Sequence, residues 1–166
     1  MTLWLIYFNK MKIELWVVGK TAFKYLDEGI ALYEKRLRHY TPFELVVLPD
    51  IKNPPLSMDA LKTKEGDLIL NRLTKDDILV LLDENGKQQT SIEFSKFIEH
   101  QQINSTKRLV FQIGGAFGFS DAVYNRANAQ LSLSKMTFSH QMIRLFFVEQ
   151  LYRAFTIIRG EKYHNE

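Results

Sequence analysis

The chain has 166 residues, 46% of them hydrophobic and 25% charged, and a formal net charge of +3 at neutral pH. This length suits one compact domain that buries a core of its own, and the mild basic excess permits a polyanionic partner without indicating one. No cysteine occurs, which excludes disulfide scaffolds, thiol nucleophiles and cysteine-based zinc sites and suits a cytoplasmic location.

Residues 1–10 are expected to form an extension outside the fold. Their apolar run over 3–8 is too short to span a membrane, and it lacks the charged start and small-residue cleavage site of a signal peptide. The first strand-like segment begins beside Met11. We therefore expect Met11 to be the true start and residues 11–166 to form a single domain that does not contact a membrane.

The first third of the domain alternates strand-like and helix-like segments. Residues 12–18 read as a strand that Gly19 ends, and apolar residues then recur at helical spacing over 23–37. A second strand is expected over 43–48. The segment 49–57 holds three of the four prolines and is predicted to be a loop.

The middle third continues the alternation. A polar helix is expected over 59–73, followed by a continuous apolar run over 78–82 that is typical of a buried parallel strand. Asn85-Gly86 predicts a turn directly after that strand. Thr90-Ser91-Ile92-Glu93 is a capping box, which predicts a helix that begins there and ends near residue 101.

The last third contains strands over 109–113 and 131–133, a short helix over 120–128, and the longest helix over 140–159. The alternation along the whole chain predicts an α/β domain with a mostly parallel sheet flanked by helices. The apolar residues of the last helix cover more than one of its faces, so they must be buried against more than one surface. In a domain this small, the second surface is expected to be another subunit.

Three loops are predicted to meet where the strands end, because the carboxyl ends of parallel strands share one edge of the sheet. They are 82–87, 113–118 and 134–138. The glycines in the first two let the backbone approach a ligand closely, although each could also serve only to turn the chain. Together the loops predict a nucleotide-sized pocket. Neither a dinucleotide fingerprint nor a phosphate-binding loop with its lysine is present.

Charged residues lie within the apolar last helix. His140 and Arg144 are four residues apart, as are Glu149 and Arg153, so each pair can share a helix face. Because burying unpaired charge costs several kcal/mol, we favour functional roles for the two arginines. The alternatives are a surface ion pair between Glu149 and Arg153, and an ordinary helix-terminal position for His140.

Read together, an ordered set of segments resembles the RlmH family, the pseudouridine-N3 methyltransferases of bacterial 23S rRNA. The resemblance runs from Met11 to the end of the chain, and its last third is the most specific part. The segments are Met11-Lys12-Ile13, Tyr33-Glu34-Lys35-Arg36-Leu37, Lys64-Glu65-Gly66, Leu82-Asp83 with Gly86-Lys87, Ile113-Gly114-Gly115, LSLSKMTF at 131–138, His140-Gln141-Met142-Ile143-Arg144, Glu149-Gln150-Leu151-Tyr152-Arg153-Ala154 and Tyr163-His164.

This resemblance implies a minimal SPOUT α/β-knot fold: a parallel sheet flanked by helices, with the carboxyl-terminal third threaded as a trefoil knot. It implies a homodimer with S-adenosyl-L-methionine held in the knot, and no metal. The cofactor-binding residues carried over by position are Leu82, Gly114, Leu133, Ser134, Lys135, Met136, Thr137 and Phe138. Ser139 departs from the family pattern, which has proline before the histidine, so this loop is expected to be looser.

The implied reaction is methylation of N3 of a pseudouridine in 23S rRNA, on the assembled ribosome because the chain has no room for a separate RNA-binding domain. The catalytic candidates are His140 or His164 as proton acceptor, with Arg144 or Arg153 holding the base or phosphate; Tyr163 and His164 are candidates for RNA contact. Two alternatives stay open: a SPOUT methyltransferase of tRNA or of another rRNA base, and a non-catalytic knotted dimer that binds the ribosome.

Overall fold

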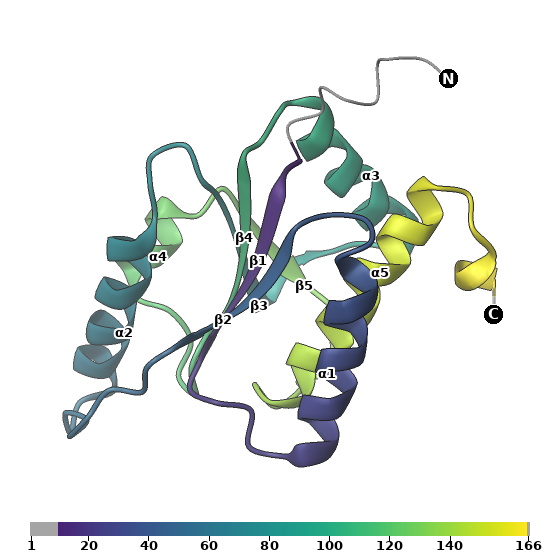
Figure 1. Ribbon diagram of the computed structural model, residues 1–166. Helices are drawn as coiled ribbons and strands as arrows, with labels where there is room; N and C mark the ends of the chain where they lie inside the picture. The colour runs from purple at the N-terminus through teal and green to yellow at the C-terminus, as the bar shows by residue number, and fades with distance from the viewer. Residues whose placement is uncertain (1–9, 166) are drawn as a thin grey trace.

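The computed structural model describes residues 10–165, so the expected extension lies outside the described residues apart from Lys10. Five strands and five α-helices alternate along the chain, and a short 3-10 helix follows them (Figure 1). The strands are β1 (Lys12–Val18), β2 (Phe43–Leu48), β3 (Ile78–Gln88), β4 (Arg108–Ile113) and β5 (Ala129–Ser132). The helices are α1 (Lys24–Leu37), α2 (Met58–Arg72), α3 (Ser91–Ile103), α4 (Asp121–Arg126), α5 (Met142–Ile158) and the 3-10 helix Lys162–Asn165.

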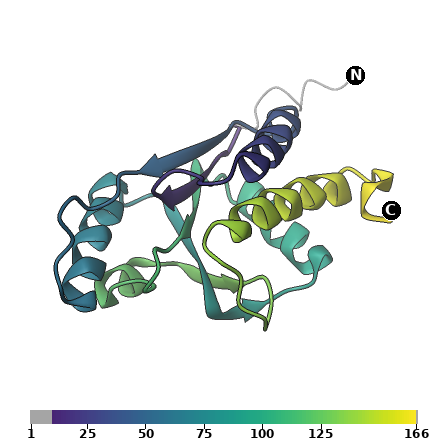
Figure 2. The same ribbon diagram turned by 90° about the horizontal axis from the view of Figure 1, so that it is seen from below.

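All four strand pairs are parallel, and the strand order is β2-β1-β4-β3-β5. Helices α1, α3 and α5 cover one face of the sheet, and α2 and α4 cover the other (Figures 1 and 2). Right-handed crossovers explain this division. Helices α1 and α3 belong to connections that lead to a strand nearer the β2 edge of the sheet. Helices α2 and α4 belong to connections that lead to a strand nearer the β5 edge. The predicted parallel α/β sheet flanked by helices is thus confirmed.

Successive side chains of each strand point to opposite faces of the sheet, so the core forms two layers. Ile13, Leu15 and Val17 of β1 are buried beneath α1, α3 and α5, while Trp16 between them is buried on the side of α2 and α4. Because both faces of the sheet are covered, the central strands read as nearly continuous apolar runs. This coverage fixes the strand ends, and therefore the loops that follow them, in one rigid frame.

Helix α5 lies between α1 and α3. Phe147, Val148 and Leu151 are fully buried along it, and Gly29 of α1 permits the close approach of Leu145. A Cβ at Gly29 would lie 3.0 Å from the Leu145 side chain. The helix begins at Met142, two residues later than predicted, and Gly160 follows its end with a φ of +68°.

The turn predicted at Asn85-Gly86 is wrong. Strand β3 runs on to Gln88, and its last two residues pair with Leu131 and Ser132 of β5 after an irregularity in the register. Gly86 serves close strand approach, because a Cβ there would lie 2.7 Å from the Leu131 backbone. The capping box at the start of α3 is confirmed, with both reciprocal hydrogen bonds present.

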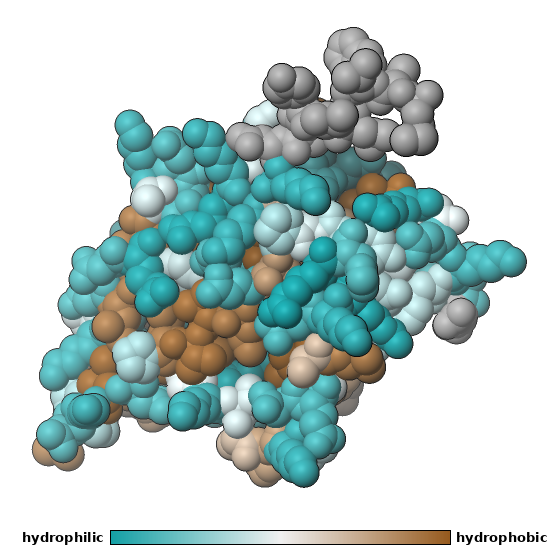
Figure 3. All heavy atoms as spheres, in the orientation of Figure 1, coloured by the Kyte–Doolittle hydropathy of each residue, from teal (hydrophilic) through white to brown (hydrophobic). Residues whose placement is uncertain are grey.

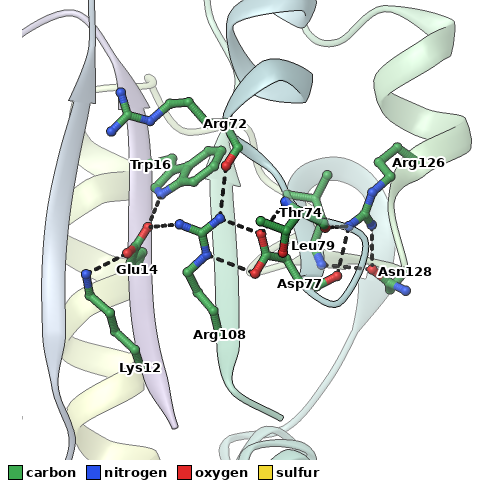
Figure 4. Close-up of polar contacts among 10 residues, drawn as sticks. All are labelled: Lys12, Glu14, Trp16, Arg72, Thr74, Asp77, Leu79, Arg108, Arg126 and Asn128. Atoms are coloured by element: carbon green, nitrogen blue, oxygen red, sulfur yellow. Dashed lines mark hydrogen bonds and ion pairs between the residues drawn. The ribbon is translucent and has the colours of Figure 1, made fainter.

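A polar network ties strands β1, β3 and β4 together at the amino-terminal edge of the sheet (Figure 4). Arg108 bonds to the buried carboxylate of Asp77 through two nitrogens and lies 3.6 Å from the buried carboxylate of Glu14. The indole of Trp16 donates to Glu14 at 2.6 Å, and the Arg108 guanidinium lies over its ring. These contacts lie at the edge opposite to the loops that follow the strands.

Strand β2 forms one edge of the sheet, and Figure 3 shows an apolar area over its carboxyl end, between the sheet and α2. The exposed Val47 belongs to this strand. Between residues 10 and 165, no helix combines the length and the apolar character needed to cross a membrane.

Candidate functional site

A cavity of about 610 Å³ opens at the carboxyl-terminal edge of the sheet. Its wall is built from the irregular part of β3 at residues 82–85, the loop after β4, and the end of β5 with the loop that follows it. Tyr124 of α4 and Ile143 of α5 complete the wall. The three predicted segments therefore meet, although the first of them is part of a strand and not a loop. The volume lies within the range of small-molecule and cofactor sites, roughly 300–1,000 Å³.

Seven of the eight residues expected to bind a cofactor line this cavity. They are Leu82, Gly114, Leu133, Ser134, Met136, Thr137 and Phe138. Lys135 belongs to the same loop, but its exposed side chain is not part of the wall. The quoted segments that contain these residues thus converge on one concave site.

Short polar contacts hold the loop between β5 and α5. The Ser132 hydroxyl donates to the Ser134 carbonyl at 2.8 Å, and the Met136 amide donates to the Ser134 hydroxyl at 2.9 Å. Ser139, which departs from the family pattern, accepts a hydrogen bond from the Met142 amide at 3.1 Å. This contact satisfies one of the free amides at the start of α5, so the serine anchors the loop to the helix.

The glycine loop after β4 depends on small residues at two places. A Cβ at Gly114 would come within 3.2 Å of the Phe119 ring. Gly118 has a φ of +83°, a backbone conformation that residues other than glycine rarely adopt. Glu65 of α2 lies behind the loop, 2.7 Å from where a Cβ of Gly115 would stand. Burial, and secondarily the charge of Asp50, raise the pKa of Glu65 above its ordinary value.

Sequence reasoning missed an acidic pair in the wall, Asp83 and Glu84. The Tyr124 hydroxyl donates to one oxygen of Asp83, and the Asn85 amide donates to the other at 2.8 Å. Burial, and then the hydrogen bond to Asp83, raise the pKa of Tyr124 to about 12, so the phenol remains a neutral donor. Asp83 directly follows the buried apolar part of β3, which was a usable signal in the sequence. Nothing in the sequence linked it to Tyr124.

Arg144 is buried and is not part of the cavity wall. Its guanidinium donates to the carbonyls of Val18 at 2.9 Å and Gly19 at 3.0 Å, to Thr21, and to the carbonyl of His140 at 3.1 Å. Burial lowers the pKa of Arg144, against a weaker opposite effect of Asp50. The arginine therefore connects the end of β1 to the start of α5, while His140 itself lies in the exposed part of the wall.

Arg153, Tyr163 and His164 form a second cluster, away from the cavity. Arg153 donates to Glu149 at 2.6 Å and lies over the Tyr163 ring, and Tyr163 donates to Glu149 at 3.1 Å. The Nδ1 atom of His164 is buried without a hydrogen-bond partner among residues 10–165. The ion pair between Glu149 and Arg153, which was the alternative to a functional role, is present, and both side chains are 20% exposed.

The two groups of catalytic candidates lie at opposite ends of α5. Arg153 is eleven residues beyond Met142, about 17 Å along a helix that rises 1.5 Å per residue. None of Arg153, Tyr163 and His164 lines the cavity. One chain therefore does not bring them together with His140. Within residues 10–165, no group of three or more histidine or acidic side chains is arranged to hold a metal ion.

Known proteins resemble this chain over nearly its whole length. A family model described as "Predicted SPOUT methyltransferase" matches residues 11–164. A protein named ribosomal RNA large subunit methyltransferase H from Cytophaga hutchinsonii is 57% identical over 155 residues, which cover 93% of this chain and 100% of the relative. Its namesake from Parabacteroides distasonis is 57% identical over 157 residues, and that from Flavobacterium johnsoniae is 52% identical over 157 residues. Both matches cover 94% of this chain and 100% of the relative.

Proposed function

We infer that this chain, which belongs to the SPOUT methyltransferase family, is an enzyme that methylates large-subunit ribosomal RNA. The observation that carries this conclusion is the identity of 57% over the full length of a relative named for that activity. The cavity at the carboxyl edge of the sheet supports it, because ligands of parallel α/β proteins bind at that edge.

We propose that S-adenosyl-L-methionine is the methyl donor and that it binds in this cavity. The volume of about 610 Å³ can hold a molecule made of a nucleoside and an amino acid. The wall offers backbone groups of three loops, and Asp83 and Glu84 suit a cationic ligand. Leu82, Gly114 and the loop from Leu133 to Phe138 would hold it, with Lys135 outside the wall.

We further propose N3 of a pseudouridine in 23S rRNA as the methylated atom, in the assembled ribosome and in the cytoplasm. The family resemblance supports this target. When bound, the donor would supply an electrophilic methyl carbon attached to positively charged sulfur. Residues of this chain would then have to accept the proton that N3 loses on methylation.

His140 is the candidate base nearest the donor site, because it alone among the four catalytic candidates lines the cavity. We assign Arg144 a positioning role, since its guanidinium holds the His140 carbonyl and the end of β1. Arg153 and His164 would contact the RNA base or phosphate together with Tyr163. Holding N3 in line with the methyl carbon supplies much of the remaining rate enhancement.

We propose that the enzyme is a homodimer, because a second copy could bring the Arg153 cluster of one chain to the cavity of the other. Two exposed aromatic pairs support such contact, and Phe138 of one pair lines the cavity. Phe23 and Tyr25 are 50% and 61% exposed with ring centroids 5.6 Å apart, and Phe138 and Phe146 are both 39% exposed with centroids 4.9 Å apart. Exposed apolar patches of this kind mark interfaces.

We also propose the trefoil knot that the family resemblance implies. Strand β5 lies at the sheet edge, yet α5 lies between α1 and α3, so the chain must return across the helix layer. On the way, Thr137 donates to Glu84 at 3.3 Å, beside the connection that leads into α3. Pulling the two chain ends apart in a single-molecule experiment tests this, because a knotted chain extends less than its contour length.

Labelled methyl transfer from S-adenosyl-L-methionine tests the function. The substrates are ribosomes from cells that lack this enzyme, naked ribosomal RNA and tRNA, with the labelled base mapped afterwards. Label on a 23S pseudouridine in assembled ribosomes is the expected result. Label confined to tRNA or to another ribosomal base would overturn the target and retain the chemistry.

A non-catalytic ribosome-binding dimer is the alternative from another class. It predicts no label on any substrate and no binding of the methyl donor in calorimetry. Donor binding without transfer, combined with binding to ribosomes, would show a cavity that has kept its ligand and lost its reaction.

A further inference from the structure

One carboxylate in the cavity wall carries a charge that no cation of the described chain balances. The buried carboxylates of Glu14 and Asp77, and the half-buried one of Glu149, each have an arginine within 4 Å. Asp83 is also partly buried, but between residues 10 and 165 it takes part in no ion pair, and its two partners are the neutral Tyr124 hydroxyl and Asn85 amide.

The rest of the wall does not balance this charge. Glu84 adds a second carboxylate, and the described lining contains neither lysine nor arginine. Tyr124 and His140 are the remaining titratable side chains of the wall. An unbalanced carboxylate in a partly buried site costs stability, which a bound cation would recover. The cavity is therefore electrostatically prepared for a positively charged ligand.

Donor and by-product of the reaction differ in charge. S-adenosyl-L-methionine carries one net positive charge on its sulfonium, and S-adenosyl-L-homocysteine, a neutral thioether, carries none. Resting on the proposed function, we propose that Asp83, fixed by Tyr124, makes the cavity select the cationic methyl donor over the neutral by-product. The two neutral hydrogen bonds hold the carboxylate in place without neutralising it, and each oxygen keeps a free lone pair. Methyl transfer removes the charge that this carboxylate attracts, so the by-product leaves more easily.

Calorimetry of the full chain with three ligands tests the proposal: S-adenosyl-L-methionine, S-adenosyl-L-homocysteine, and sinefungin, which carries an ammonium where the donor has sulfonium. Asp83→Asn should weaken binding of both cationic ligands by about tenfold, as expected for one charge pair in a partly solvated site. Binding of the neutral by-product should change by less than about twofold. Asparagine has the same shape: its oxygen can accept from the Asn85 amide, and its NH2 group can donate to the Tyr124 hydroxyl, which reverses the direction of that bond.

Two controls separate charge from structure. Tyr124→Phe keeps the charge of Asp83 and removes one hydrogen bond. The ratio of donor affinity to by-product affinity should therefore change less than in Asp83→Asn. Asp67→Asn, an exposed carboxylate of α2 outside the cavity wall, should leave the ratio unchanged. An equal loss of affinity for cationic and neutral ligands in Asp83→Asn would show a merely structural role and overturn the proposal.

The unmodified protein provides a test that does not depend on the folding of a variant. Raising the salt concentration should weaken binding of the donor more than that of the by-product, because salt screens charge attraction. Equal salt dependence of both ligands would overturn the selection by charge. Failure of the unmodified protein to bind either ligand would instead overturn the proposed donor itself, so the two failures are distinguishable.

Discussion

Arg144 lies among apolar residues in the sequence, and in the structure its buried side chain binds backbone carbonyls. Its guanidinium bonds to the carbonyls of Val18, Gly19 and His140, so it holds two segments of the site in place and does not face the cavity. Sequence reasoning found the residue because buried charge is unusual. It could not find the partners, since backbone carbonyls leave no mark in a sequence.

Arg144→Ala should lower the free energy of unfolding by about 3 kcal/mol, because it leaves the buried carbonyls of Val18 and Gly19 without their charged donor. Urea denaturation measures this. Arg38→Ala is the matched control, since the Arg38 side chain is 62% exposed and its one ion pair within residues 10–165 spans 3.9 Å. The control should lose under about 1 kcal/mol. A similar small loss for both variants would contradict the anchoring role.

The ionisation of Asp77 predicts how the stability of the protein depends on pH. Burial alone would raise the pKa of Asp77, but hydrogen bonds from Arg108 and the Thr74 backbone outweigh it and hold this pKa below its ordinary value. A carboxylate with a lowered folded pKa stabilises the protein fully above its unfolded pKa of about 3.9, and this contribution disappears as the pH falls through the folded pKa.

Asp77→Asn should therefore cost about 2 kcal/mol at pH values near 7, and the difference from the unmodified protein should shrink below about pH 4. Urea unfolding at a series of pH values measures it. Asp59→Asn, whose side chain is 92% exposed, is the control and should show no such dependence. A constant difference between Asp77→Asn and the unmodified protein at all pH values would argue against a charged Asp77.

At the scale of elements, periodicity predicted every strand and every α-helix, with ends that differ by a few residues. The largest error concerns Gly86, where a short Asn-Gly signal indicated a turn and the structure continues β3 as far as Gln88. Glycine permits both a turn and a close strand approach, and only the position of β5 decides between them. The order of the strands was equally absent from the sequence pattern, because it depends on long-range pairing.

Gly86→Ala should disrupt the pairing between β3 and β5, because its Cβ would lie 2.7 Å from the backbone of Leu131. We expect a loss of about 2 kcal/mol in unfolding free energy and a marked loss of donor affinity, since both strands lead into the cavity wall. Gly160→Ala, with a φ of +68° and nothing within 4 Å of its Cβ, should lose only about 1 kcal/mol and keep donor affinity.

At the scale of the molecule, the cavity and the Arg108 network lie at opposite edges of one sheet. The cavity opens at the carboxyl ends of the strands, and the Arg108 network joins their amino ends. The sequence predicted the first edge through its loops and through the family resemblance. It gave no indication of the second, because the residues of that network are spread over three strands and their connections.

In the homodimer that we propose, the separation of His140 from Arg153 predicts complementation between subunits. His140→Ala and Arg153→Ala should each abolish most methyl transfer. A mixed dimer, purified through two different tags, should recover about half of the wild-type rate if each site takes one residue from each chain. Single-turnover methylation measures this. An inactive mixed dimer would mean that each chain uses its own pair of residues. Full activity of either single variant would mean that the substituted residue is not needed.

The long sequence separation between Arg144 and the carbonyls that it binds affects folding during synthesis. The carbonyls of Val18 and Gly19 that it binds precede it by 126 and 125 residues. At translation rates of roughly 5–20 residues per second, the end of β1 waits about 6–25 s for its partner to be made. A nascent chain halted before residue 144 can pair its first strands but lacks the helix that anchors the pocket. The anchored pocket therefore forms only after residue 144 has been made.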